Sequence, residues 1–258
     1  MIEFGLSISS EEHFETLPIK KAAKFDFLEF SGSLLDSEPA CRKLESLQKA
    51  GVALVVRDLL NPSLVRLVPT EKFQVHLEFD RQLHLRCSAA ASLGADMAGA
   101  AFDVEKALED SEYAASLIKL LKSSFATFYN NGLEILLPGR IPASPGSEDI
   151  TKVISFSYQL LNPHLITAIE FHPHEPGAFD ELEKHFNILR FHRNYWRVFF
   201  EPEHGNYLSS SLLKKFLDAA DMKSVVSSRV AIAPGNQMPD DDTLQELLKL
   251  IGEIENEY

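Results

Sequence analysis

Two histidines and two carboxylates lie close together in the segment Glu170-Phe-His-Pro-His-Glu175, which follows an apolar run. Neutral imidazoles and carboxylates bind divalent metals and also move protons in catalysis. In an extended segment, Glu170 and His172 share one face because alternate residues of a strand point the same way. The alternative is a polar loop in which one histidine bonds a backbone carbonyl. We expect His172 to be catalytic or to bind a metal, and His174 to contact the substrate.

A second polar group, Glu201-Pro-Glu-His204, also follows an apolar segment. Glu201 would supply a further carboxylate for catalysis or metal binding, and His204 would supply an imidazole for substrate binding. The alternative is a solvated acidic loop. Glu29 lies between apolar neighbours in Leu28-Glu-Phe30, where a buried and unpaired charge costs several kcal/mol. We therefore expect Glu29 to point into a polar site as a catalytic carboxylate, and the alternative is that it pairs with a cation.

Arg57 and Arg140 are the candidates for binding an anionic part of a substrate, because a guanidinium matches carboxylate and phosphate groups with two parallel hydrogen bonds. The alternative for Arg57 is an internal ion pair with Asp58 or Glu29. Asp103 is a further candidate for a catalytic carboxylate, although it also fits the N-cap of the helix that follows it.

The elements that would position these side chains alternate between strand and helix along the whole chain. The apolar stretches are followed by helical patterns and are not separated by any Pro-, Gly- or Ser-rich linker. One helix is expected to begin at a capping box in Ser9-Ser-Glu-Glu12, and Pro138-Gly-Arg-Ile-Pro142 is expected to turn out of the fifth strand. The expected strands are 2–9, 25–31, 52–58, 96–102, 133–137, 165–171, 195–201 and 229–233.

Eight such units predict a single (β/α)8 TIM barrel that spans residues 1–258, with its site on the loops that follow the strands. The strands are nearly continuous apolar runs, as expected for strands that are covered on both faces. The seventh strand has two candidates, 187–192 and 195–201. We prefer 195–201 because an apolar helical stripe continues up to residue 189. A doubly wound open sheet is the alternative, but no glycine-rich phosphate loop follows the first strand.

The chain of 258 residues has a formal net charge of −13, which disfavours binding to nucleic acids or to anionic membranes. No stretch is long and apolar enough for a membrane span, and the N-terminus reads directly as a strand, so we expect a cytoplasmic protein. Cys41 and Cys87 lack the spacing of a metal site and are expected to be free thiols.

Several segments together resemble the xylose isomerase-like TIM barrels, which include sugar phosphate isomerases, epimerases and AP endonucleases. The resemblance covers nearly the whole chain but consists of layout with weak local motifs. It rests on Phe4-Gly-Leu-Ser-Ile-Ser9, Phe25-Asp-Phe-Leu-Glu-Phe-Ser31, Gly132-Leu-Glu-Ile-Leu-Leu137 and Ile169-Glu-Phe-His-Pro-His174.

The resemblance implies a divalent metal held by acidic and histidine ligands at the ends of strands five to eight. In this chain the fifth strand ends in Leu137-Pro138 and the eighth in Ala231-Ile-Ala-Pro234, so two expected carboxylates are missing. Only the sixth strand, through Glu170 or His172, and the seventh, through Glu201, supply family-like ligands. The site is therefore expected to be diverged, and it is either metal-free or holds a metal differently.

The resemblance implies an isomerase or epimerase for a sugar or sugar phosphate, in which Glu201 and His172 exchange protons while Arg57 and Arg140 orient an anionic end. The alternative is a barrel that has lost catalysis and binds a small polar ligand or a protein partner. An AP endonuclease is disfavoured by the acidic charge. Substrate identity and oligomeric state do not follow from the sequence.

Overall fold

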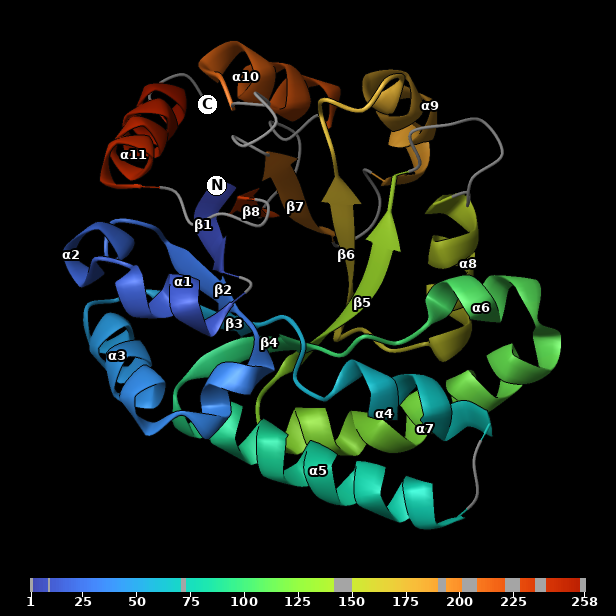
Figure 1. Cartoon of the computed structure of the whole chain (residues 1–258). Helices are drawn as coiled ribbons and strands as arrows, with labels where there is room; N and C mark the ends of the chain where they lie inside the picture. Colours follow the sequence, from blue (N-terminus) through green and yellow to red (C-terminus); the bar gives the residue numbers. More distant parts are fainter. Residues whose placement is uncertain are drawn as a thin grey trace.

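The computed structural model of the chain is a closed barrel of eight parallel strands surrounded by helices (Figure 1). The strands pair in chain order, and β8 returns to pair with β1. The structure describes residues 2–8, 10–70, 73–141, 150–189, 194–200, 208–220, 228–234 and 240–255. The predicted (β/α)8 barrel is confirmed. Its strands are β1 (Ile2–Ile8), β2 (Phe27–Phe30), β3 (Ala53–Val56), β4 (Ala95–Gly99), β5 (Glu134–Arg140), β6 (Leu165–Phe171), β7 (Asn194–Phe200) and β8 (Ser228–Pro234).

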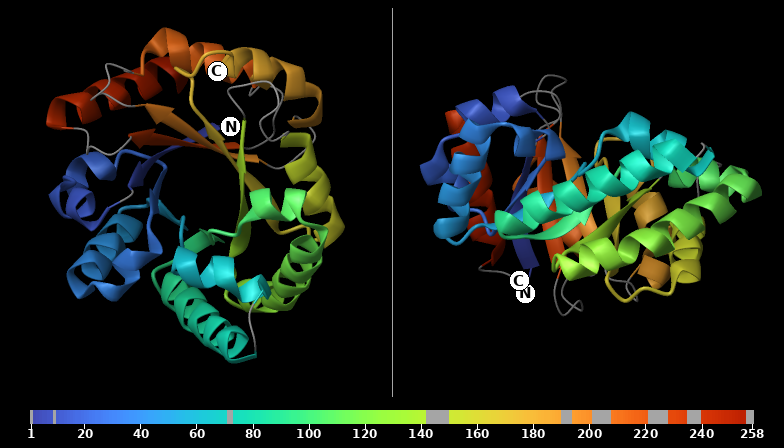
Figure 2. Two further views of the ribbon diagram at one scale, coloured as in Figure 1. Left: turned by 45° about the vertical axis from the view of Figure 1, so that its right-hand side comes forward. Right: turned by 90° about the horizontal axis from the view of Figure 1, so that it is seen from below.

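Helices form the outer ring of the barrel, as both views in Figure 2 show. None of the helices in the described part of the chain is both long and apolar enough to cross a membrane. The α-helices are α1 (Glu11–Thr16), α2 (Ile19–Ala22), α3 (Glu38–Lys49), α4 (Pro62–Leu67), α5 (Phe73–Ser92), α6 (Val104–Glu109), α7 (Ser111–Asn130), α8 (Ile150–Leu160), α9 (Ala178–Leu189), α10 (Ser210–Ala219) and α11 (Asp241–Glu255), and two short 3-10 turns span Gly32–Asp36 and Val68–Thr70.

The structure corrects two local predictions. The helix-capping hydroxyl belongs to Ser10, which accepts a 3.2 Å hydrogen bond from the backbone N–H of His13, so the cap lies one residue later than the predicted box. Strand β5 continues through Pro138 and Gly139 to Arg140, where a turn was predicted. The strand continues because β6 pairs with it up to Arg140 and Glu170. Arg140 therefore stands at the end of a barrel strand.

The two candidates for the seventh strand are resolved in favour of the later segment. Strand β7 spans Asn194–Phe200, close to the predicted 195–201. The earlier candidate, 187–192, overlaps the end of α9, and its last residues lie outside the described part of the chain.

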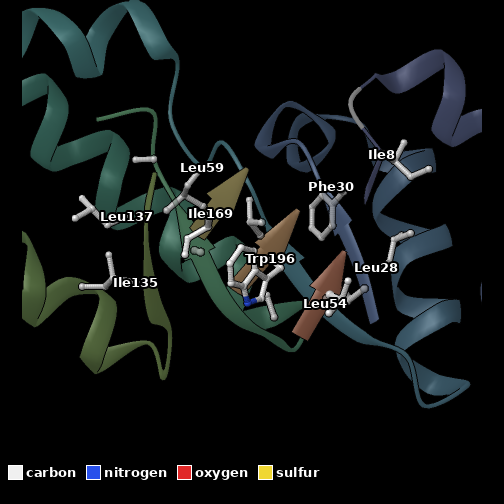
Figure 3. Close-up of a cluster of buried hydrophobic side chains, with 14 of the residues drawn as sticks. Ile8, Leu28, Phe30, Leu54, Leu59, Ile135, Leu137, Ile169 and Trp196 are labelled. Carbon is white, nitrogen blue, oxygen red and sulfur yellow. The ribbon is translucent and has the colours of Figure 1, made fainter. Parts of the chain in front are cut away.

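Side chains of the strands form two separate apolar clusters, one on each face of the sheet. Side chains that point outward pack beneath the helices, and Figure 3 labels several of them, including Ile8, Leu28, Phe30 and Trp196. Side chains that point inward fill the middle of the barrel. This inner cluster consists of Phe27, Val55, Met97, Leu136, Ile166, Ala168, Tyr195 and Ala231. Burial on both faces explains why the strands read as continuous apolar runs.

Strand β1 contributes a glycine to the inner cluster. A Cβ atom on Gly5 would lie 2.3 Å from a ring carbon of Phe27, on the neighbouring strand. Because Phe27 is fully buried, its ring cannot move aside without disturbing the cluster. Gly5 therefore leaves the space that the Phe27 ring occupies.

Polar side chains lie at both ends of this apolar cluster. At the N-terminal end, Arg229 donates hydrogen bonds to Glu3 (2.6 Å) and to both carboxylate oxygens of Asp96 (2.9 and 2.7 Å). Its guanidinium carbon lies 5.4 Å from the centre of the Phe27 ring, so this ionic group packs directly on the apolar layer. Side chains at the C-terminal end include the buried Glu29 together with Glu170 and Arg197, and the latter two line a pocket.

We predict that Gly5→Ala lowers the free energy of unfolding by about 1–3 kcal/mol, because the added methyl group overpacks the inner cluster. Chemical denaturation with urea measures this change. The matched control is Gly252→Ala in α11, where an added Cβ meets no atom within 4 Å and helix propensity favours alanine.

Phe27→Leu should partly relieve the clash, so the double variant Gly5→Ala/Phe27→Leu should lose less stability than the sum of the two single variants. Simple additivity of the two changes would contradict the contact between these residues.

Candidate functional site

A pocket of about 1000 Å³ opens at the C-terminal ends of β3 to β7. In a TIM barrel this end carries the catalytic residues, because the loops after the strands converge there. The inner side chains Leu136 and Ala168 form part of its floor. Its charged lining residues are Arg57, Asp58, Arg66, Asp103, Glu105, Glu109, Arg140, Glu170, Glu175 and Arg197.

Glu29, on β2, is fully buried and forms a dense set of hydrogen bonds. Its carboxylate accepts bonds from the Ser7 hydroxyl at 2.7 Å and from Nε of Arg197 at 2.9 and 2.8 Å. Burial raises the pKa of Glu29, but Arg197, Arg57 and the Ser7 bond together bring the pKa below its ordinary value of 4.5. Glu29 is therefore an ionised group that pairs with a cation, which is one of the two outcomes expected for it.

Arg197, on β7, is the buried partner of Glu29 and lines the pocket. Its Nη1 atom lies 3.7 Å from Oε1 of Glu170, on the adjacent strand β6. Burial lowers the pKa of Arg197, but the negative charge of Glu29 and the nearby Tyr195 and Glu170 raise it above its ordinary value. The guanidinium is therefore a permanent cation that connects Glu29 below with Glu170 at the pocket.

Arg197 is a site residue that was not predicted from the sequence. The signal was present, because a single arginine lies inside the apolar segment Tyr195-Trp-Arg-Val-Phe-Phe200. The argument that required a partner for Glu29 applies equally to this arginine, since neither charge is tolerated alone in a core.

Tyr195 lies beneath this ion pair in the inner cluster. The guanidinium carbon of Arg197 lies 5.6 Å from the centre of its ring. Burial raises the pKa of Tyr195 well above its ordinary value, and the charge of Glu29 raises it further. The buried hydroxyl has no hydrogen-bond partner of good geometry among the described residues.

The two arginines expected to bind anions are each paired with a carboxylate. Nε of Arg57 lies 3.0 Å from Oδ2 of Asp58, so the internal ion pair considered for Arg57 is present. Arg140 forms an ion pair with Glu175 at the rim. Both arginines line the pocket, but neither presents an uncompensated positive charge to a ligand.

Asp103 and Glu170 are the carboxylates that the structure places most clearly at the pocket. Asp103 accepts a 3.0 Å hydrogen bond from the backbone N–H of Lys106 and so caps α6, while it also lines the pocket. Glu170 is paired in register with Arg140 on one side and Arg197 on the other. Its side chain is 34% exposed, so a ligand in the pocket can reach it.

His172 and His174 are not among the described residues that line this pocket. The His172 ring stacks on Phe199, with ring centres 4.4 Å apart and planes at 3°. His174 is exposed to solvent. The predicted site residues Glu201 and His204 lie outside the described part of the chain.

The residues at the described strand ends do not fit the divalent metal that the family resemblance implies. The inner face of β5 ends in Pro138 and Arg140, and that of β8 carries Ala231 and Ala233. Strand β7 presents Arg197 to the pocket, and a guanidinium repels a metal cation. Of the residues at these described strand ends, Glu170 on β6 is the carboxylate that faces the pocket. Among the described residues, no three His, Cys, Asp or Glu side chains are grouped as a metal site would need.

Comparison with known proteins gives structural matches without sequence matches. No protein-family model matches the chain, and no curated protein matches its sequence. The solved structure of D-psicose 3-epimerase from Clostridium cellulolyticum H10 has a TM-score of 0.69 and 12% identity over 97% of each chain. A xylose isomerase domain protein from Alicyclobacillus acidocaldarius has a TM-score of 0.60 and 15% identity over 96% of this chain and 98% of its own.

The same fold also occurs with different chemistry. A GH18 chitinase from Pseudoalteromonas aurantia has a TM-score of 0.62 and 9% identity over 96% of this chain and 99% of its own. Identities this low establish the fold alone. The resemblance to xylose isomerase-like barrels seen in the sequence is confirmed at that level: this chain has their barrel.

Proposed function

We propose that the protein binds a small hydroxyl-rich ligand of the sugar class in the barrel-mouth pocket and acts on it as an isomerase or epimerase. The observation that carries the proposal is the position of Glu170, an accessible carboxylate beside the buried cation Arg197 at the end of the barrel. Sugar epimerases among the structural neighbours support the substrate class.

The charges that line the pocket favour an uncharged sugar over a sugar phosphate. Among the described residues the lining contains four arginines and six acidic side chains. Three of the arginines have carboxylate partners, namely Asp58 for Arg57, Glu175 for Arg140 and Glu29 for Arg197. A phosphate dianion would therefore enter a pocket with an excess of negative charge. A lining that contains both guanidinium donors and carboxylate acceptors instead suits sugar hydroxyl groups, which both donate and accept hydrogen bonds.

Glu170 is the proposed base. It removes a proton from a hydroxyl-bearing carbon next to the ligand's carbonyl. The electron pair of that C–H bond forms a carbon–carbon double bond, and the π pair of the carbonyl moves onto its oxygen to give an enediolate. Return of the proton to the neighbouring carbon, with transfer of the hydroxyl proton of the first carbon to the former carbonyl oxygen, gives the isomer and restores the carboxylate. Return to the same carbon from the opposite face gives the epimer and needs a second acid.

Other expected site residues keep the roles that the sequence suggested, as parts of this proposal. Asp103, which lines the pocket, is proposed as the second acid, and Glu201 is the alternative outside the described residues. Arg57, Arg140 and His204 are proposed to contact the ligand's oxygens. His172 and His174 lie outside the described pocket lining and take no part in this proposal. A cytoplasmic location stays a prediction.

The second candidate is a barrel that binds such a ligand without converting it. It is favoured by the misfit between the described strand ends and a divalent metal, because a metal would supply charge stabilisation for the reaction. The two candidates differ in one observable, which is exchange of the ligand's carbon-bound hydrogen with solvent.

We predict that Glu170→Gln lowers the rate of this exchange by about 100-fold or more, the usual contribution of a general base, while ligand binding persists. The measurement is NMR in D₂O with D-fructose, D-psicose and D-tagatose, followed by calorimetric binding of the sugars that exchange.

The matched control is Glu183→Gln, which changes an exposed carboxylate on α9 that is not part of the pocket lining. This variant should catalyse hydrogen exchange of the sugars at the wild-type rate. Sugar binding without exchange in the wild type would favour the binding protein. Tighter binding of the phosphate esters than of the free sugars would contradict the uncharged ligand.

We predict that Glu29 stabilises the fold in a pH-dependent way and takes no part in proton transfer. Because its folded pKa lies below 4.5, its contribution is complete above the unfolded pKa and is lost as the pH falls through the folded pKa. Glu29→Gln should lower the free energy of unfolding near pH 6 by about 3–5 kcal/mol, since it leaves Arg197 buried and unpaired.

That difference from the wild type should shrink as the pH falls below 4.5, as measured by urea unfolding between pH 6 and pH 3. If Glu29→Gln does not fold, Glu29→Gln/Arg197→Met removes both charges and should be the more stable variant. A difference that stays constant with pH would show that Glu29 is not ionised in the native protein.

A further inference from the structure

The mouth of the barrel holds a fixed cation where the family resemblance implies a divalent metal. Arg197 projects from β7, one of the four strands expected to supply metal ligands, and its side chain is 4% exposed. We infer that the Arg197 guanidinium is the electrophile of this site and takes the place of a metal ion. This inference rests on the proposed function and adds to it the group that stabilises the reacting oxygen.

The ion pair is difficult to explain as a device for stability alone. Burying two charges costs several kcal/mol for each ion, and an apolar pair of similar volume is often at least as stable. The layer directly beneath is apolar, so an apolar pair would continue the existing packing. A guanidinium that a ligand must contact accounts for the charge at this position.

The contacts of Arg197 orient one edge of its guanidinium group toward the pocket. Nε is held by both oxygens of Glu29, and Glu29 is itself held by the Ser7 hydroxyl. Nη1 lies on the side of Glu170, at 3.7 Å, which is too long for a hydrogen bond and leaves room for a ligand atom to compete. Ser7 and Glu29 are therefore positioning residues.

The other arginines of the pocket suit this role less well. Arg57 and Arg140 have side chains that are 20% and 46% exposed, and both are paired with carboxylates near the rim. A buried donor stabilises developing charge more than an exposed one, because water does not screen it. Arg140 and Arg197 both lie in register with Glu170, and Arg197 is the buried one of the two.

In the proposed step, Arg197 stabilises the negative charge that forms on the ligand. As Glu170 takes the proton from carbon, negative charge develops on the former carbonyl oxygen. The Nη groups of Arg197 donate hydrogen bonds to that oxygen without losing a proton, since a guanidinium stays protonated throughout the accessible pH range. For the isomer, Glu170 gives the proton to the neighbouring carbon while the hydroxyl proton of the first carbon moves to the former carbonyl oxygen, so that the carbonyl forms on the first carbon. For the epimer, the second acid protonates the first carbon from the opposite face, the original carbonyl re-forms, and Glu170 releases its proton to solvent.

The first experiment measures dependence on metal in the wild-type protein. After dialysis against EDTA, we expect no bound divalent metal by elemental analysis and no rise in melting temperature on addition of Mn²⁺. Hydrogen exchange of the ketohexoses in D₂O and their calorimetric binding should be unchanged by EDTA. A stoichiometric metal that raises the melting temperature, or exchange that needs Mn²⁺, would overturn the inference and leave the proposed function intact.

The second experiment replaces the cation itself. Arg197→Met should lower exchange by about 100-fold or more, the usual loss when an oxyanion donor is removed. Arg197→Ala should regain part of the rate with added guanidinium ion and none with Mn²⁺. If the single variants fail to fold, the same measurements are made in the Glu29→Gln background, where no buried carboxylate is left unpaired.

The matched control is Arg229→Met, which removes the partly buried guanidinium at the opposite end of the barrel. It should lose stability but keep the wild-type exchange rate and sugar affinity. Equal losses of exchange in the folded Arg197 and Arg229 variants would reduce Arg197 to a structural role. If the wild-type protein binds sugars without exchanging their hydrogens, the proposed conversion is wrong. If Arg197→Met then loses sugar binding while Arg229→Met keeps it, Arg197 is still part of the binding site.

Discussion

The ion pair between Glu29 and Arg197 is the interaction on which the arrangement of this site depends. The two residues come from β2 and β7, which are not neighbours in the barrel, so their side chains meet across its interior. Each charge would be strongly destabilising alone. Each is satisfied by the other, and Glu29 also accepts a hydrogen bond from Ser7 on β1. The barrel must close in register for this contact to form, because the partners lie 168 residues apart in the chain. The polar layer and the closure of the sheet therefore stabilise each other.

The rest of the interior follows from where this pair lies. Below it the cluster around Phe27 and Tyr195 excludes water, which strengthens the attraction between the two charges. Gly5 is required because the ring of Phe27 occupies the centre of that cluster. At the opposite end Arg229 makes a comparable ionic contact with Asp96 and Glu3. The two charged ends differ in one respect that matters for function: the C-terminal end opens into a pocket of about 1000 Å³, where a ligand can reach the charges.

The alternation of strands and helices could be predicted because it depends on local pattern. Strand β6 has the bounds 165–171 that its apolar run indicated, and Glu29 could be assigned a buried polar environment from its neighbours alone. The continuation of β5 past Pro138 could not be predicted, because it depends on pairing with β6. The local residues, Pro138 and Gly139, favoured a turn instead. The partner of Glu29 could not be chosen either. From the sequence, any of several cationic residues could pair with Glu29. The closed sheet is what brings Arg197 to it.

Shared architecture does not decide the chemistry of this barrel, since sugar epimerases and a chitinase have the same fold at comparable TM-scores. The side chains at the strand ends decide it. A divalent metal needs several anionic or neutral ligands that converge on one point, and β5 and β8 present Pro138 and Ala233 there. Where the described strand ends lack those ligands, a guanidinium fixed to the chain supplies a single positive charge and needs one carboxylate to hold it. Glu29 is that carboxylate, and in the reaction that we propose Glu170 is then left accessible to move a proton.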